Sequence, residues 1–166
     1  LKAKKAIRPV VTADVYAPAF CKISLTENST VSAGENIKSD ELTIEAVNNA
    51  SVRNLTIDAQ AVKVRLANNA TGRFDVYCNE FEYAASNSAS STLVLNCNNF
   101  IATTENSSIT TVDGDFKDMK VSARNSSTLT VTGNGKTLAV EGSNSASLKL
   151  DNLTVEEASV ALTNSC

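Results

Sequence analysis

The stretch NSSTLTVTGNGKTLAVEGSNSASLKL, residues 125–150, contains two copies of one short unit. Asn125-Ser126-Ser127 opens the first copy, and Asn144-Ser145-Ala146 opens the second copy nineteen residues later. Each opening is followed by residues that alternate between apolar and polar. If the whole chain repeats this unit, the repeat decides the fold.

The nineteen-residue step recurs through most of the chain. Asparagine holds every step of one series: Asn49, Asn68, Asn87, Asn106, Asn125 and Asn144. Large apolar residues fill three further columns: Leu55, Phe74, Leu93, Val112, Val131, Leu150; Val62, Phe81, Phe100, Met119, Leu138; and Val64, Tyr83, Ala102, Val121, Val140. Polar columns lie between them: Lys63, Glu82, Lys120; and Thr56, Asp75, Asp113, Thr132, Asp151. Asn28 lies 21 residues before Asn49 and Asn164 lies 20 after Asn144, which predicts small turn insertions in the end units.

The alternation within each unit predicts strands, because a helix would need apolar residues at a spacing near 3.6. A unit of nineteen residues is too short for a propeller blade of about forty. We therefore predict an all-β fold, a single-stranded parallel β-helix (solenoid) with about 19 residues per coil, and we expect it to be right-handed. Residues 1–18 are expected to form an N-terminal cap or lead-in, and residues 19–166 about eight coils.

A solenoid explains the repeated asparagine, because each coil must turn a corner at the same place. Asparagine tolerates the left-handed backbone of a sharp turn, and stacked amides can hydrogen-bond from coil to coil. Asn-x-Ser/Thr is also the N-glycosylation acceptor, and it occurs at Asn28, Asn49, Asn54, Asn69, Asn106, Asn125 and Asn152. The series nevertheless continues through Asn68, Asn87 and Asn144, which do not fit the acceptor pattern. A structural corner therefore explains the repeat better than glycosylation does.

Composition excludes several function classes. The chain has 166 residues, 42% of them apolar, a net charge of -3 and neither His nor Trp. The absence of His removes the commonest general base and metal ligand, and the negative charge argues against nucleic acid as a partner. A basic cluster, Lys2, Lys4, Lys5 and Arg8, precedes the first acid. No apolar run is long enough to span a membrane, and residues 1–10 lack the apolar core of a signal peptide. Because the chain begins with Leu1 and not with Met, we expect it to be a processed or truncated product.

The four cysteines pose a question of pairing. Cys78 and Cys97 are nineteen residues apart in the column Ala59, Cys78, Cys97, Phe116. Stacked in-register neighbours keep their Cβ atoms about 4.8 Å apart, slightly farther than a disulfide prefers. Buried free thiols fit this column better than a disulfide does. Cys21 and Cys166 are expected at opposite ends of the rod, where they cannot pair within one chain.

Three stretches are candidate binding sites. VDGDFKD, residues 112–118, places Asp113, Asp115 and Asp118 near a glycine turn, but the calcium-loop pattern is missing. TGNGK, residues 132–136, lacks the spacing of a phosphate loop. The outward strip Tyr77, Asn96, Asp115, Asn134 joins an exposed aromatic ring to polar groups and could contact a sugar, although an ordinary solvated face explains it better. The sequence predicts no catalytic, cofactor-binding or metal-binding residue.

The segment VYAPAFCKISLTENSTVSA, residues 15–33, followed by coils of the form NSSTLTVTG, resembles the head GIN domain family. This is a family of autotransporter-adhesin type from Bacteroidetes-type bacteria, whose members usually place Gly-Ser-Gly at the corner where this chain has Asn followed by two small residues. The resemblance implies a β-helix, an exported location in the periplasm or at the cell surface, and no established enzymatic activity.

Two function classes follow. The first is a non-catalytic, adhesin-like β-helix module that binds a glycan or another protein, or forms a homodimer through the coil ends. The second is a glycan-active β-helix enzyme of the polysaccharide lyase or hydrolase type, an analogy at the level of the fold alone. The regular spacing from Asn49 to Asn144 leaves no room for the long loops that usually build such an active site, which favours the module.

Overall fold

The computed structural model describes residues 12–166 and is built of strands joined by short turns. The strands are β1 (Lys22–Leu25), β2 (Thr30–Ser32), β3 (Ile37–Val47), β4 (Ser51–Ala67), β5 (Thr71–Ser86), β6 (Ser90–Glu105), β7 (Ile109–Arg124), β8 (Thr128–Ser143), β9 (Ser147–Lys149) and β10 (Leu153–Leu162). Within residues 12–166 there is no helix of the length and apolarity that a membrane span requires.

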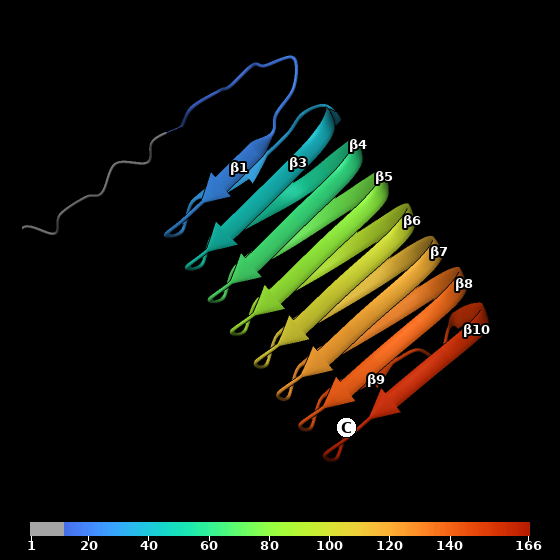
Figure 1. Ribbon diagram of the computed structural model, residues 1–166. Helices are drawn as coiled ribbons and strands as arrows, with labels where there is room; N and C mark the ends of the chain where they lie inside the picture. Colours follow the sequence, from blue (N-terminus) through green and yellow to red (C-terminus); the bar gives the residue numbers. More distant parts are fainter. Residues whose placement is uncertain (1–11) are drawn as a thin grey trace, which may run out of the picture.

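The strands pair in parallel and in sequence order, so the predicted solenoid is confirmed. The order is β1-β3-β4-β5-β6-β7-β8-β10, with β2 on β4 and β9 on β8. The rod has about seven turns of roughly 19 residues. In Figure 1 each long strand passes behind, curls over at the far side and returns in front while the chain advances toward the C-terminus, which is the right-handed sense. Residues 12–166 contain eight corners, which bound seven complete turns. The predicted number of about eight coils is reached when the partial coils at the two ends are included.

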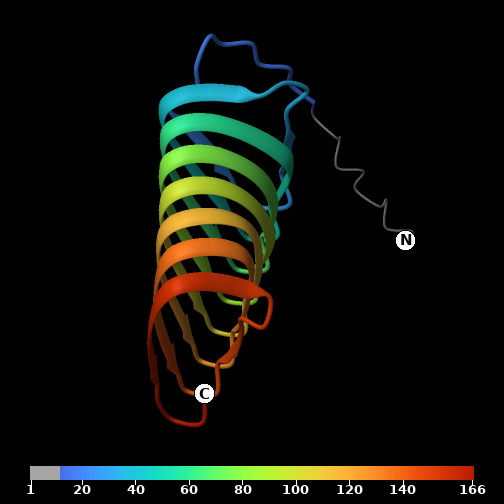
Figure 2. The same ribbon diagram turned by 90° about the vertical axis from the view of Figure 1, so that its right-hand side faces the viewer.

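Each coil is one long strand that bends back on itself, and the core lies between its two halves (Figure 2). We call this bend, which Gln60, Asn79 and Asn98 mark in successive coils, the far bend. The columns expected to point inward do so from Leu55 to Val131, from Val62 to Leu138 and from Val64 to Val140, all buried. Phe81, Phe100 and Phe116 stack in this core with ring centroids 5.5 Å apart in each successive pair. Alternation thus buries every second residue along each half of a coil, and it breaks at the bend, where two consecutive residues such as Asn79 and Glu80 are exposed.

The repeated corner is a two-residue left-handed turn. Its first residue has a φ of 50–57° and its second a φ of 59–66°, from Glu27-Asn28 through Asn164-Ser165. The third residue of the corner is small and buried, as at Ala70 and Ser108. Such angles disfavour most side chains but are tolerated by asparagine, which explains why this residue recurs.

Side-chain amides connect the corners, with each Asn donating from Nδ2 to Oδ1 of the preceding rung at 2.9–3.0 Å. The rungs are Asn48, Asn68, Asn87, Asn106, Asn125, Asn144 and Asn164. The prediction that Asn49 begins the ladder is therefore wrong. Asn49 holds the second corner position, and Asn28 stacks on it through a backbone bond to Asn48.

The extra residues of the irregular coils lie away from the corners, in a bulge in one coil and in a turn, as predicted for the end units, in the last coil. Between β4 and β5 the register shifts between Val52 and Leu55, where Asn54 has a φ of 49°. This bulge makes Asn48 and Asn68 twenty residues apart. In the last coil a turn bonds Leu153 to Leu150, so Leu153 pairs with Gly133 and Asp151 leaves its expected column.

The two ends of the rod differ. At the N-terminal end Val15 and Tyr16 are exposed, while Phe20 packs against the core. The basic cluster and most of the expected cap lie outside the described residues. At the C-terminal end, Val160 and Leu162 of β10 are 57% and 51% exposed, because β10 is the last strand of the sheet.

Candidate functional site

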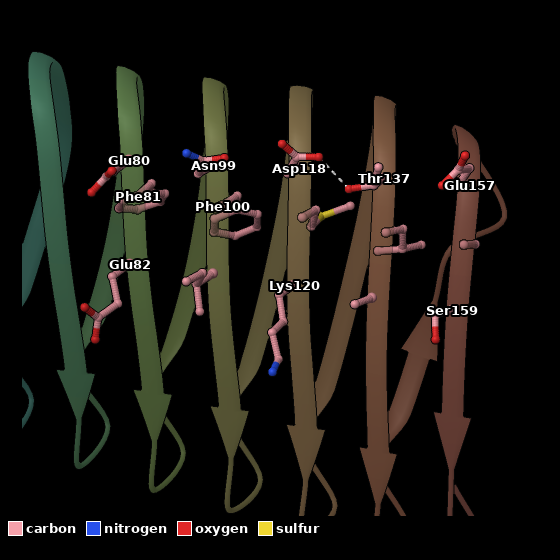
Figure 3. A pocket seen from close by; sticks show the side chains of 15 residues that line it. Glu80, Phe81, Glu82, Asn99, Phe100, Asp118, Lys120, Thr137, Glu157 and Ser159 are labelled. Carbon is pink, nitrogen blue, oxygen red and sulfur yellow. Dashed lines mark hydrogen bonds between the residues drawn. The ribbon is translucent and has the colours of Figure 1, made fainter.

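A groove of about 730 Å³ crosses β5, β6, β7, β8 and β10. It lies just after the far bend of each coil, where two outward-facing columns flank one inward-facing column (Figure 3). One wall is Glu80, Asn99, Asp118, Thr137, Glu157, the other is Glu82, Ile101, Lys120, Ala139, Ser159, and Phe81, Phe100, Met119, Leu138, Ala158 lie beneath. Strand register places each member of a wall directly beside the next.

The groove is acidic at its two ends, and its middle coil contributes one charge of each sign, Asp118 and Lys120. Glu80 and Glu82 stand at one end and Glu157 at the other, while Ile101 is 52% exposed between them. Some charges are paired: Glu82 accepts from Lys63 at 2.7 Å, and Lys120 lies 3.7 Å from Glu141. Asp118 accepts a hydrogen bond of 2.6 Å from Thr137. These contacts fix the walls in place before any ligand arrives.

A second, shallower hollow of about 320 Å³ lies on the other side of the far bend. It contains Tyr77 and Asn96 from the strip identified in the sequence, together with Asp58 and the stacked amides Gln60, Asn79, Asn98. These amides bond to one another at 2.5 Å and 2.8 Å. Tyr77 is 49% exposed. The other half of the strip lies outside this hollow, where Asn134 donates to Asp115 at 2.9 Å.

The acidic stretch VDGDFKD does not form a turn. It lies within β7, and its three carboxylates accept hydrogen bonds from three different residues of β8: Asp113 from Thr132, Asp115 from Asn134 and Asp118 from Thr137. The expectation of a glycine turn there was wrong, because Gly114 continues the strand ladder beside Leu95. Among residues 12–166 no three or more Cys, Asp or Glu side chains gather in a group suited to a metal ion.

The stretch TGNGK also lies within a strand, β8, and forms no loop. Its Gly133 has a φ of 116°, and a Cβ there would lie 1.9 Å from the carbonyl oxygen of Gly114. A Cβ on Gly114 would in turn lie 2.0 Å from the carbonyl oxygen of Leu95. The glycines therefore allow close stacking of neighbouring backbones.

The cysteines are all free thiols. Cys78 and Cys97 pair in register on β5 and β6, and Cys97 is buried whereas Cys78 is half-buried and lines the shallow hollow. The column containing them points inward, as expected. Cys21 and Cys166 are exposed near the two ends.

Sequence reasoning missed the groove and the second amide ladder. The groove depends on where the coil bends. Two patterns in the sequence held that information. The inward columns of Cys78 and Phe81 are three residues apart, which breaks the alternation at the bend. Gln60, Asn79 and Asn98 are nineteen residues apart and mark the far bend as the Asn corner marks the near one.

Comparison of the chain with protein-family models, with curated proteins and with solved structures found no match in any of the three.

Proposed function

We propose that this chain is a non-catalytic binding module whose long groove holds an extended ligand, in the first place a glycan strand. The observation that carries this proposal is the groove itself, which crosses several coils without interruption. The strands β5, β6, β7 and β8 each run without a break through the far bend, so no loop interrupts the groove there.

The chemistry of the walls supports a polymer with many hydroxyl groups. Carboxylates, an amide and hydroxyls recur along the axis at the strand spacing of about 4.8 Å. That spacing is similar to the rise of one sugar ring in an extended glycan. Ile101 and Ala139 offer apolar contact to a ring face between the polar ends.

A glycan array followed by affinity measurement tests this proposal. Ala139→Trp should fill the groove and weaken binding at least about tenfold, a loss of about 1.4 kcal/mol. Ala84→Trp is the matched control, because Ala84 is also half-buried on the returning half of its coil but does not line the groove. Equal affinity of the two variants would contradict the proposal.

One observation favours the glycan-active enzyme as a second candidate. Glu80 and Asp118 stand on the same wall two coils apart, with Asn99 between them, so two carboxyl groups border the same groove. Most glycosidases act through a pair of carboxyl groups that flank the scissile bond. A depolymerisation screen separates the two candidates: turnover that Glu80→Gln and Asp118→Asn abolish would replace the binding module with an enzyme.

We further propose an exported location, periplasmic or at the cell surface, and self-association of two copies through the C-terminal coil. The location follows from the resemblance to the head GIN domain family. Self-association is supported by the apolar side chains of β10, which continue the core columns into solvent. An unpaired strand edge beside them invites pairing with a second copy. Localisation of a tagged full-length protein by cell fractionation tests the location, and sedimentation velocity tests the self-association.

A further inference from the structure

The most reactive pair of groups outside the groove is the stacked dithiol at the far bend. Cys78 and Cys97 are register partners on adjacent parallel strands, whose Cα atoms lie about 4.8 Å apart. Both thiols belong to the inward-facing column that begins at Ala59. In-register pairing therefore places the two thiols side by side on neighbouring coils.

The surroundings make the two thiols unequal. Cys78 lines the shallow polar hollow, and its column neighbour Ala59 leaves space beside it. Cys97 is 5% exposed and has the large ring of Phe116 on its other side. A small polar molecule entering the hollow can therefore reach Cys78 but not Cys97.

Electrostatic effects also separate the pKa values of the two thiols. The hydrogen bond from Cys97 lowers the pKa of Cys78, against the smaller opposing effects of burial and of the Glu80 carboxylate. Donation of that same proton, together with burial, raises the pKa of Cys97. The accessible sulfur is thus the better thiolate, and the buried thiol keeps its proton.

We propose that Cys78 and Cys97 form a peroxide-reactive dithiol site, in which Cys78 attacks a small hydroperoxide such as hydrogen peroxide and Cys97 resolves the product. In the first step the Cys78 thiolate attacks one peroxide oxygen, the O–O bond breaks, and hydroxide leaves to take up a proton as water. Cys78 is then a sulfenic acid. In the second step the Cys97 sulfur attacks the Cys78 sulfur, the S–O bond breaks, and the proton of Cys97 leaves with the hydroxyl as a second water.

The resulting disulfide would join two neighbouring coils. In-register parallel neighbours hold their Cβ atoms slightly farther apart than a relaxed disulfide needs, so the bond carries strain. Strained disulfides are reduced easily, and a thiol reductant should restore both thiols. The site is therefore expected to cycle rather than to lock the rod permanently.

The experiment uses the full chain with Cys21→Ser and Cys166→Ser, which removes the two exposed thiols. Reduced protein is treated with hydrogen peroxide, alkylated, digested and analysed by mass spectrometry. The expected product is a Cys78–Cys97 disulfide that dithiothreitol reverses. Iodoacetamide should alkylate Cys78 at least about tenfold faster than Cys97 before any oxidation.

Two variants separate the roles. With Cys97→Ser, Cys78 should stop at a sulfenic acid that dimedone traps, whereas with Cys78→Ser, Cys97 should remain unmodified. If either variant fails to fold, the alkylation rates and the disulfide of the protein with both thiols still decide. Equal alkylation of the two thiols, or peroxide treatment that yields no disulfide between them, would overturn the proposal.

Discussion

The amide nitrogen of Asn106 donates to Oδ1 of Asn87 in the preceding coil at 3.0 Å, and this bond is one rung of a ladder along one edge of the rod. Asn106 also accepts from Asn125 and holds a φ of 52°. Asn106→Ala should therefore lower the free energy of unfolding by about 1–3 kcal/mol, since it removes both bonds and places alanine in a left-handed turn.

Chemical denaturation measures this loss. Asn106→Asp tests the two halves of the rung, because aspartate accepts from Asn125 but cannot donate to Asn87. Ser90→Ala, at an exposed position of β6, is the control and should change stability by less than about 0.5 kcal/mol. If Asn106→Ala is as stable as the control, the ladder contributes nothing to the fold.

Gly133→Ala should destabilise the rod by at least about 2 kcal/mol. Its Cβ would collide with the backbone of Gly114, which no side-chain rotation can relieve, and its φ of 116° is unsuited to alanine. Gly34→Ala is a matched control, because nothing lies within 4 Å of a Cβ there. Thermal melts that move equally for both variants would contradict the close backbone stacking.

Stability should fall as the pH rises above about 10, the pKa of an unperturbed tyrosine. Burial raises the pKa of Tyr83, against smaller opposing effects of its hydrogen bonds with Ser91 and Thr110. The contribution of the protonated Tyr83 hydroxyl to the free energy of unfolding is fully present below the pKa that this group has in the unfolded chain. Above that pKa the contribution is lost, because the unfolded chain then releases a proton that the folded chain keeps. Tyr83→Phe should reduce this loss by up to about 1.4 kcal/mol per pH unit.

Near neutral pH the same variant should be less stable than the parent protein. The Tyr83 hydroxyl lies 2.5 Å from the Ser91 hydroxyl, and both groups are buried. Removing one partner leaves the other without its bond, at a cost of about 1–3 kcal/mol. Urea denaturation at pH 7 and at several pH values above 10 distinguishes these effects, and identical pH profiles for both proteins would rule out the Tyr83 contribution.

Sedimentation velocity should detect a dimer that Val160→Lys disrupts. This change places a charge on the exposed apolar end of the core, where a second copy is expected to pair. Ile109→Lys is the control, since Ile109 is 52% exposed on β7 away from that end. If Cys166 links the two copies, Cys166→Ser or a reductant should make the dimer depend on concentration. A monomer at every concentration would refute the end-to-end contact.

The fold could be predicted because equivalent positions in successive coils of a solenoid recur at a fixed spacing in the sequence. Columns such as Leu93, Val112 and Val131 are stacked neighbours in the rod and equal steps in the chain. The first rung was misplaced because Asn48 and Asn49 are adjacent, and a period cannot say which of two asparagines holds the position. Only the backbone bulge before Leu55 resolves the choice.

The sites were much harder to predict than the fold. Tyr77 was found because an aromatic residue in an outward column is conspicuous. The groove between the Glu80 and Glu82 columns was not, since its shape arises from the bend of the strand and not from any one residue type. The three aspartates of β7 were misread for the opposite reason: residues close in sequence lie in separate columns, each bonded to the next coil.

The hydrogen bonds of the asparagine ladder all point in one direction, and this direction limits which residue each corner can hold. Every amide donates toward the N-terminus, so an interior rung must both donate and accept. Glu27 occupies the corner position before Asn48, and an ionised carboxylate can only accept. A glutamate can therefore begin such a series but cannot stand in its middle, and any coil stacked beyond Asn164 must supply a donor.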